Sequence, residues 1–237
     1  MLWRQNSKRC WGSSVPAQKA PRGFARMARR PAGYIPLDEL IDLFAEGDEV
    51  VANVTFEELE LEGDVANGTT FEGVLFRSCI FDGVDFSGST FRDTVFRGCR
   101  FIRCNFDRAW LNRCDFYDCS APGASFIGAR LSSVSFGSCD LSYANFSDAH
   151  LGPLAARSCR MGEASLQGAK LGQVKLDGCD LTRVDVFGAA LGGLDVSTCE
   201  FQAPMVSGDY HELRGLKVNV EQALALSGLL GIEIVDD

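Results

Sequence analysis

Cysteine recurs every twenty residues over a long stretch of this chain, inside a stricter repeat of five. The series consists of Cys79, Cys99, Cys119, Cys139, Cys159, Cys179 and Cys199. A large apolar residue recurs every five residues from Phe71 to Phe201, and 25 of these 27 positions carry Phe, Leu, Val or Met, with Ala121 and Ala156 as exceptions. Neither the 3.6-residue period of a helix nor the two-residue period of a strand keeps such positions on one face. The repeat therefore predicts a coil that turns a corner every five residues.

Small side chains two residues before each large one indicate how many corners make one turn. One series at spacing twenty consists of Ala109, Ala129, Ala149, Ala169 and Ala189, and the cysteines form another. Four pentads therefore make one turn. Coils stacked by backbone pairing rise by about 4.8 Å each, so nearly seven coils give a rod of roughly 33 Å whose interior is filled by side chains.

The pentads resemble those of the pentapeptide-repeat family. The units that carry the resemblance are Val84–Gly88 (VDFSG), Ala144–Asp148 (ANFSD) and Cys179–Arg183 (CDLTR). The resemblance implies an all-β fold, a right-handed quadrilateral parallel β-helix, and the hand and the square section come from the family alone. We expect short capping helices at both ends, because an open coil exposes unpaired backbone groups.

The chain divides into four expected parts. Residues 1–34 are expected to be a disordered basic extension, with eight Lys or Arg residues and no Asp or Glu. Such a segment is compatible with a transit peptide or with an extension upstream of a start at Met27. Residues 35–70 are expected to hold a capping helix through Leu37, Leu40, Ile41 and Phe44 and an irregular entry to the coil. The five-residue register can be traced weakly back through Leu61, Phe56 and Val51, but Asp64 would then fall at an inward site, so residues 62–70 are expected to be irregular. Residues 71–205 are expected to form the β-helix, and residues 206–237 a C-terminal cap that is also a candidate dimerisation segment.

Nine of the ten cysteines occupy inward positions that Ala and Val also occupy, which favours buried, reduced thiols and a cytoplasmic protein. We considered zinc at Cys99, Cys104, Cys114 and Cys119, but thiols on three walls of a filled rod are badly placed for tetrahedral ligation, so no metal is expected. The longest apolar stretch near the C-terminus, 222–232, is too short to span a membrane, and no membrane association is expected.

The C-terminal segment Gly215–Leu226 resembles the ending of the Qnr-type quinolone-resistance branch of the family. Asn219 is the expected N-cap of a helix there, and Gly231 its expected end. The resemblance implies a homodimer through this end and binding to DNA gyrase or topoisomerase IV as a DNA mimic that protects against fluoroquinolones. Apolar residues in excess of what one capping face needs form the expected dimer interface: Val220, Ala223, Leu224, Leu226, Leu229, Leu230 and Ile232.

Charge distribution limits the mimicry hypothesis. The net charge is −9, but residues 71–201 hold fifteen acids and thirteen bases, whereas residues 38–64 hold eleven acids and no base. Since duplex DNA carries one charge per about 1.7 Å, only a local stripe of the coil could imitate it. One wall supplies such a stripe, with Asp85, Asp107, Asp148 and Asp185 against Arg108, and it is the expected partner-binding surface. A second wall is basic, with Arg92, Arg113, Arg130 and Lys170. The competing interpretation is that Asp and Asn before the central residue bond the backbone at corners.

No catalytic residues and no cofactor are predicted. His150 and His211 lie neither at metal-ligand spacing nor beside a candidate nucleophile, and a filled rod offers no cleft that would separate the pKa values of paired carboxylates. Two hypotheses remain for a non-enzymatic protein. The first is a gyrase- or topoisomerase IV-binding DNA mimic that confers fluoroquinolone tolerance and does not itself bind nucleic acid. The second is a rigid interaction scaffold or regulator with an unrelated partner, favoured by the neutral coil and the acidic segment 38–64.

Overall fold

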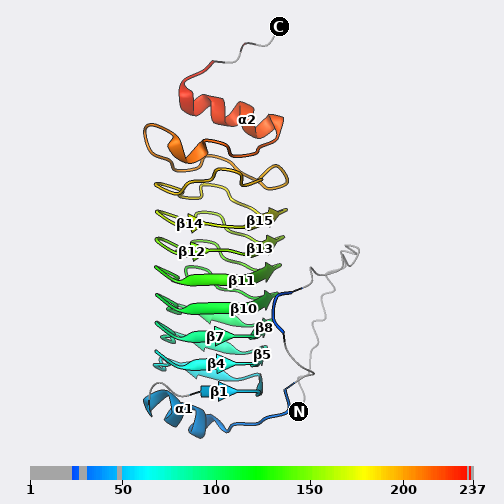
Figure 1. Ribbon diagram of the computed structural model, residues 1–237, viewed down its shortest axis with the longest axis vertical. Coiled ribbons are helices and arrows are strands. Elements are labelled where there is room, and N and C mark those ends of the chain that lie inside the picture. Colours follow the sequence, from blue (N-terminus) through cyan, green and yellow to red (C-terminus); the bar gives the residue numbers. More distant parts are fainter. Residues whose placement is uncertain (1–22, 27–30, 47–49, 234, 236–237) are drawn as a thin grey trace, which may run out of the picture.

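The chain forms a rod of stacked parallel coils (Figure 1). The computed structural model describes residues 23–26, 31–46, 50–233 and 235. Residues twenty apart pair in register, as in Phe71 with Phe91 and Leu111 with Leu131. The parallel β-helix implied by the family resemblance is therefore confirmed, and so is the turn of four pentads predicted from the repeat. Figure 1 shows α1 (Leu37–Glu46) at one end of the rod and α2 (Val220–Ser227) at the other.

The coil has four walls, which we number by their inward residues in one turn: Phe71 for wall 1, Phe76 for wall 2, Phe81 for wall 3 and Phe86 for wall 4. Walls 1 and 2 belong to one twelve-stranded sheet and wall 3 to a three-stranded sheet. Wall 4 is held by isolated parallel bridges such as Asp85 with Asn105. Each wall therefore presents a file of residues spaced one coil apart.

The strands are short because each covers one wall. Wall 1 contains β1 (Val50–Ala52), β4 (Thr70–Glu72), β7 (Thr90–Arg92), β12 (His150–Leu151) and β14 (Lys170–Leu171). Wall 2 contains β2 (Thr55–Glu57), β5 (Leu75–Arg77), β8 (Val95–Arg97), β13 (Leu154–Arg157) and β15 (Val174–Asp177). Wall 3 contains β3 (Glu60–Glu62), β6 (Ile80–Asp82) and β9 (Arg100–Ile102). Two longer strands, β10 (Trp110–Tyr117) and β11 (Arg130–Gly137), continue from wall 1 onto wall 2.

A residue with left-handed backbone conformation lies at most corners, two positions after the inward residue. Gly occupies many of these corners, as at Gly88 (φ 67°), but Arg103 (φ 52°) and Arg183 (φ 57°) show that other residues are accepted. A positive φ redirects the chain without lengthening the turn, which is how five residues complete one wall and one corner.

We call the end of the rod that carries α1 its lower end. In the lower coils the interior is filled by stacks of Phe rings. Phe76 and Phe96 stack with ring centroids 5.0 Å apart and planes 5° from parallel, while rings from adjacent walls, such as Phe76 and Phe81, meet edge to face at 5.5 Å. In the upper coils Leu, Val and Ala replace Phe, and a small apolar cavity of about 30 Å³ lies there, with Ala156 in its lining. The sequence predicted a completely filled interior, and the cavity shows that the upper coils are not completely filled.

The coil begins earlier than the sequence predicted. Strands β1, β2 and β3 pair in register with β4, β5 and β6, and Val65 bridges Asp85. The irregular segment expected at 62–70 is therefore a regular part of the coil. Asp64 fits because it is only half-buried in the lowest coil, where its carboxylate accepts the N–H of Glu62 at 3.1 Å.

The described residues of the basic N-terminal extension also differ from the disorder predicted for residues 1–34. Gly33 bridges Val54, and the Thr55 hydroxyl donates to the carbonyl of Pro31 at 2.8 Å. Residues 23–26 lie against the side of the rod beside β8 and β10 (Figure 1). The rest of the extension, Met27 included, lies outside the described residues.

Helix α1 covers the lowest coil with part of its predicted apolar face. Leu40 and Phe44 are buried, and the Phe44 ring meets Phe71 edge to face at 6.2 Å. Leu37 and Ile41, which were expected on the same face, are exposed. Leu40 and Phe44 are four residues apart and therefore lie one above the other on the helix, which leaves Leu37 and Ile41 at the edge of the contact.

The last turn is two residues longer than the others. Asp185 still bridges Met205 at a spacing of twenty, but Asp195 bridges Lys217 at twenty-two. The extra residues form a loop containing the short 3-10 helix η1 (His211–Leu213). The chain then enters α2, whose N-cap is Asn219 as predicted. A capping box joins Asn219 and Gln222, and η2 (Gly228–Leu230) ends at Gly231 in left-handed conformation.

Candidate functional site

Two of the four predicted wall 4 carboxylates have a structural role. Asp85 and Asp185 come directly before an inward residue, and each accepts the backbone N–H two positions later, that of Ser87 at 3.0 Å and that of Phe187 at 3.1 Å. The same bond recurs at other corners, for example from Ser142 N–H to Asp140. The interpretation of Asp85 and Asp185 as hydrogen-bond acceptors at corners is therefore correct. These hydrogen bonds do not neutralise the negative charge of the two carboxylates.

The other two carboxylates are held differently. Asp107 follows the inward Phe106 and accepts the Ser125 hydroxyl and the Ile127 N–H of the next coil, the latter at 3.0 Å. Asp148 lies at a corner with φ 58° and is exposed.

The structure spreads these side chains along wall 4 and does not gather them at one point. Asp85 and Asp107 lie on successive coils, and two coils separate Asp107 from Asp148 and Asp148 from Asp185. Between them the outward positions carry uncharged residues: Ser87, Asn105, Ser125, Ile127, Asn145, Ser147, Ser165 and Gln167. Arg108 is the one base on this part of the wall.

Wall 4 differs from the other walls in how its acids are neutralised. Among the described residues, six Arg–carboxylate ion pairs join successive coils on walls 1 to 3 and their corners: Arg77–Glu57, Arg92–Glu72, Arg103–Asp82, Arg113–Asp93, Arg157–Asp177 and Arg160–Asp140. Among the residues that the structure describes, no ion pair involves Asp85, Asp107, Asp148 or Asp185. In the described part of the chain, wall 4 therefore carries a stripe of acids that form no ion pair and have Arg108 as their one basic neighbour on the wall, on a coil whose other charges largely cancel.

The predicted basic wall, wall 1, is partly neutralised. Arg113 holds Asp93 through both its Nε and Nη2 atoms and lowers the pKa of that carboxyl, while Arg92 pairs with Glu72 at 3.7 Å and lies over the Trp110 ring. Arg130 and Lys170 continue the file above Trp110, with His150 between them. This wall offers a short line of bases and no extended positive surface.

The cysteine series forms one buried file inside the rod. All nine described cysteines are free and buried. Most thiols of the series donate a hydrogen bond to a backbone carbonyl of the neighbouring coil, as Cys99 Sγ does to the carbonyl oxygen of Phe76 at 3.5 Å. The four cysteines considered for zinc bond to separate carbonyls, for example Cys104 to Phe81 and Cys114 to Phe91. Burial raises the pKa of Cys104 and of Cys114 to about 12, so both thiols are protonated at neutral pH.

The predicted dimer residues lie on the C-terminal cap, and most of them are exposed. The exposed fraction is 78% for Val220, 51% for Leu224 and 61% for Leu230, and Ala223 and Ile232 are also exposed. Leu226 and Leu229 are half-buried and line a groove of about 390 Å³ between α2 and the last turn. Helix α2 is fixed to the coil instead by Gln222, whose buried amide donates to the carbonyls of Val196 at 2.9 Å and Cys199 at 2.7 Å.

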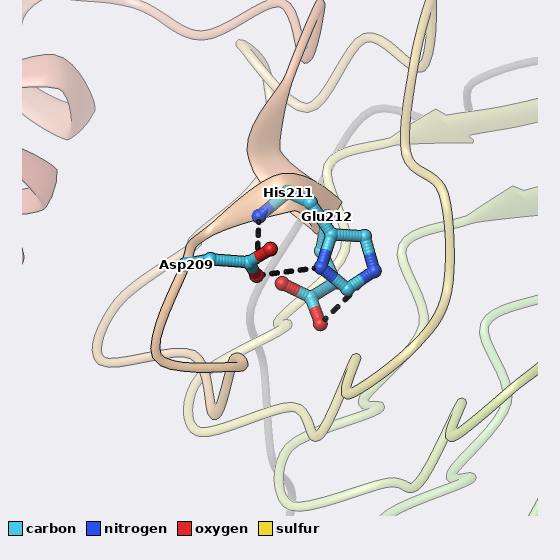
Figure 2. Close-up of side chains that lie close together, drawn as sticks. All are labelled: Asp209, His211 and Glu212. Carbon is cyan, nitrogen blue, oxygen red and sulfur yellow. Dashed lines mark hydrogen bonds and ion pairs between the residues drawn. The ribbon is translucent and has the colours of Figure 1, made fainter.

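A cluster that the sequence analysis missed lies in the long last turn (Figure 2). The ligand-type atoms of Asp209, His211 and Glu212 all lie within 4.8 Å of one another, and the Asp209 carboxylate bonds His211 Nδ1 at 2.7 Å. His211 is exposed, but the sequence analysis had found it at no metal-ligand spacing. The spacing Asp-x-His-Glu was its only signal, and it becomes informative only because η1 brings the three side chains together.

The hydrogen bonds of Glu212 account for the position of the cluster without a bound metal ion. Its side chain is fully buried and accepts the N–H groups of Gly188 at 2.8 Å and Ser207 at 3.2 Å, and the Ser207 hydroxyl at 2.8 Å. Burial alone would raise the pKa of Glu212, but these donated bonds outweigh it and the pKa lies below its usual range. The hydrogen bond to Asp209 raises the pKa of His211. The three residues could ligate a cation, but their bonds within the chain identify them as the anchor of the last turn.

Comparison with protein families identifies the repeat. A model of the pentapeptide repeat region matches residues 69–146, and a model of eight pentapeptide repeats matches residues 159–202, together just over half of the chain. The chain belongs to the pentapeptide-repeat family. Comparison with curated proteins finds no match.

This pentapeptide-repeat protein is similar to several solved structures. A trypsin-treated variant of QnrB1, a plasmid-mediated fluoroquinolone resistance protein, is 21% identical, with a TM-score of 0.35 over 79% of this chain and 99% of that chain. Full-length QnrB1 is 23% identical, with a TM-score of 0.32 over 76% and 100%. HetL, involved in heterocyst differentiation regulation in the cyanobacterium Nostoc sp. strain PCC 7120, is 18% identical, with a TM-score of 0.32 over 78% and 94%. Likeness at this level says nothing about the partner.

No helix in the described part of the chain is both long enough and apolar enough to cross a membrane.

Proposed function

We propose that this pentapeptide-repeat protein is a non-enzymatic, cytoplasmic binding protein whose wall 4 enters a positively charged DNA groove of DNA gyrase or topoisomerase IV. The observation that supports the proposal is the stripe of acids on wall 4 that lacks the ion pairs of the other walls. Opposite charges on a partner would meet carboxylates whose potential no neighbouring Arg cancels, apart from Arg108.

Corner bonding makes this surface rigid. Asp85, Asp107 and Asp185 are each fixed by hydrogen bonds from the backbone, so their carboxylates do not need to be ordered when a partner binds. Asp148 is the exception and is free to adjust to the partner. A preorganised acidic edge on a stiff rod is what an imitation of a DNA backbone requires.

The stripe is negatively charged, as DNA is, but its charge density is much lower than that of DNA. Asp85 to Asp185 spans five coils, or roughly 24 Å at 4.8 Å per coil. Duplex DNA carries about 14 charges over that length, against four carboxylates on the wall. We therefore expect binding to be electrostatically steered and strongly weakened by salt, since charges more than about 8 Å apart are screened at physiological ionic strength.

A gyrase supercoiling assay tests the proposal. The protein should inhibit supercoiling at micromolar concentration, and the double variant Asp107→Lys/Asp148→Lys should lose at least about tenfold in inhibition, because it reverses two charges in the middle of the stripe. In a bacterium, expression of the unaltered protein should raise fluoroquinolone tolerance and the double variant should not.

Asp118→Lys is the matched control. Asp118 is an exposed corner residue with φ 54°, like Asp148 with φ 58°, but it follows wall 2. The Asp118→Lys variant should inhibit supercoiling to the same extent as the unaltered protein. Equal inhibition by all three proteins, or none by the unaltered protein, contradicts the proposal.

A rigid scaffold with an unrelated partner is the second candidate, and the lower end of the rod supports it. Exposed acids gather there on α1 and the first coil: Asp38, Glu39, Asp42, Glu58, Glu60 and Glu62. A pull-down in which a non-topoisomerase protein is recovered, and is lost after charge reversal at Glu60 and Glu62, would favour this candidate over gyrase binding.

We further propose that the protein forms a homodimer through the C-terminal cap. Val220, Leu224 and Leu230 expose apolar surface beside the groove lined by Leu226 and Leu229, so a second cap could bury its own exposed side chains there. A twofold pairing of this kind uses the same patch on both chains.

Sedimentation equilibrium tests the dimer. Leu224→Glu should shift the protein to the monomer, because a charge would be buried at the contact. Leu37→Glu places the same charge at an exposed apolar position of α1, at the opposite end of the rod, and should leave the dimer unchanged. A monomeric unaltered protein, or a dimer that survives Leu224→Glu, excludes this interface.

A further inference from the structure

Residues 23–26 occupy a site on the side of the rod, far from wall 4. Three consecutive backbone N–H groups of this segment donate to two carboxylates: Phe24 to Asp115 at 2.8 Å, Ala25 to the other oxygen of Asp115 at 2.9 Å, and Arg26 to Asp93 at 2.9 Å. About ninety residues separate Phe24 from Asp115 in the sequence. The contact is therefore tertiary, and Figure 1 shows the segment beside β8 and β10.

The burial of the outward residues under the segment marks the site. Asp115 and Ser135 point outward from wall 2, yet they are 3% and 1% exposed. The equivalent residues of the adjacent coils, Val95 and Ala155, are half-buried. The Ser135 hydroxyl donates at 2.5 Å to Asp115 Oδ1, the oxygen that also accepts the N–H of Phe24. A buried carboxylate is stable only when donors replace water, and the segment supplies two of the three donors here.

The site also has a shape requirement. A Cβ added to Gly23 would lie 2.1 Å from Asp115 Oδ2 and 2.5 Å from the Tyr117 hydroxyl, so the segment needs glycine at this position. One coil above, Gly137 carries no side chain, and a Cβ there would lie 3.1 Å from the Tyr117 ring. At the other end Asp93 is oriented by Arg113 and accepts the N–H of Arg26.

We propose that Asp115, Asp93, Ser135, Tyr117 and Gly137 form a peptide-binding site on walls 1 and 2. Its ligand class is a segment that bends after a glycine and presents three consecutive backbone N–H groups to one side, and its occupant is Gly23–Arg26 of this chain. The carboxylates can be hydrated when the segment leaves, so the contact is a reversible clasp that is not needed for the coil to form. The inference is independent of the proposed function, because it uses different walls.

Binding of a peptide in trans tests the site on the full chain. The probe is a fluorescein-labelled peptide with the sequence of residues 21–28, PRGFARMA. Gly23→Val should eject the segment and leave the site open, so this variant should bind the probe. The unaltered chain should bind it at least about tenfold more weakly, because its own segment competes at a high effective concentration.

Two controls make the test decisive. The probe with valine in place of glycine should not bind, and the double variant Gly23→Val/Asp115→Asn should lose at least about tenfold in affinity. Hydrogen exchange of the unaltered chain gives an independent measure: the amides of Phe24 and Ala25 should be protected, and Asp115→Asn should remove that protection while the coil amides stay protected. Unprotected amides in the unaltered chain, or equal probe binding with and without Asp115, would overturn the proposal.

Discussion

At the scale of the residue, the corners decide which substitutions the coil accepts. The position two after the inward residue takes a positive φ at most corners, a conformation that glycine adopts freely and that costs other L-residues about 1–2 kcal/mol. Arg183 occupies such a corner with φ 57°, is exposed and forms no ion pair among the described residues. Its backbone conformation, rather than its charge, therefore determines what can replace it.

We expect Arg183→Gly to increase the free energy of unfolding slightly and Arg183→Val to decrease it, with a difference of about 2 kcal/mol between the two variants, because valine is least compatible with positive φ. Chemical denaturation measures this difference. The same pair of substitutions at Arg130, an exposed residue in β11, should give the opposite order, since valine favours a strand and glycine weakens it. The same order at both sites would show that corner backbone conformation is not the cause.

At the scale of the element, the last turn depends on one buried carboxylate. Glu212 accepts backbone N–H groups from Gly188 and Ser207 and so joins the long loop to the preceding coil. Its pKa in the folded protein lies below the usual value, so the anion is stabilised by folding. This contribution to stability is complete above the unfolded-state pKa of about 4.3 and is lost as the pH falls through the lower folded-state pKa.

We expect the protection of the Gly188 amide from hydrogen exchange to fall between pH 5 and pH 3 in the unaltered protein. In Glu212→Gln the amide should exchange faster at pH 5 and depend less on pH. Glu221→Gln, which changes an exposed acid on α2, should behave like the unaltered protein. If Glu212→Gln keeps the full pH dependence, another group holds the turn.

The elements that could be predicted from sequence are those specified by local patterns. The five-residue repeat predicted the four-walled coil, Leu40 and Phe44 predicted the lower cap, and Asn219 and Gly231 predicted the limits of the upper one. The coil below Phe71 was missed because Asp64 looks incompatible with an inward site until the open end of the rod is known. The docking of residues 23–26 on Asp115 depends on contacts between residues distant in the sequence, which no local pattern predicts. The Asp-x-His-Glu spacing of Asp209, His211 and Glu212 lies outside the five-residue repeat, and it predicts a cluster only once the conformation of the last turn is known.

At the scale of the whole molecule, the rod has a well-packed lower part and a looser upper part. Stacked Phe rings fill the coils up to Phe146, and above them the shorter Leu, Val and Ala side chains leave the cavity beside Ala156. Cavities lower stability by about 24 cal/mol per Å³, so this one corresponds to roughly 0.7 kcal/mol.

We therefore expect Ala156→Val to raise the free energy of unfolding by about 1 kcal/mol, because its added methyl groups enter the cavity. Ala149→Val is the matched control, since Ala149 is equally buried but does not line the cavity, and it should lower the free energy by about 1–3 kcal/mol through overpacking. Thermal unfolding should show melting temperatures displaced in opposite directions. A loss of stability in both variants would mean that the upper coils are packed as tightly as the lower ones.

The in-register pairing of residues twenty apart has a consequence for how such a surface can change in length. Five inserted residues would rotate everything above them by one wall, so that wall 4 acids would continue into a neighbouring file and the stripe would break. Twenty inserted residues would only lift the upper part by one strand spacing, about 4.8 Å, with every face kept in line. The length of one face can therefore change only in steps of one complete turn. A partner that binds along that face can be matched in length only by adding or removing complete turns of the coil.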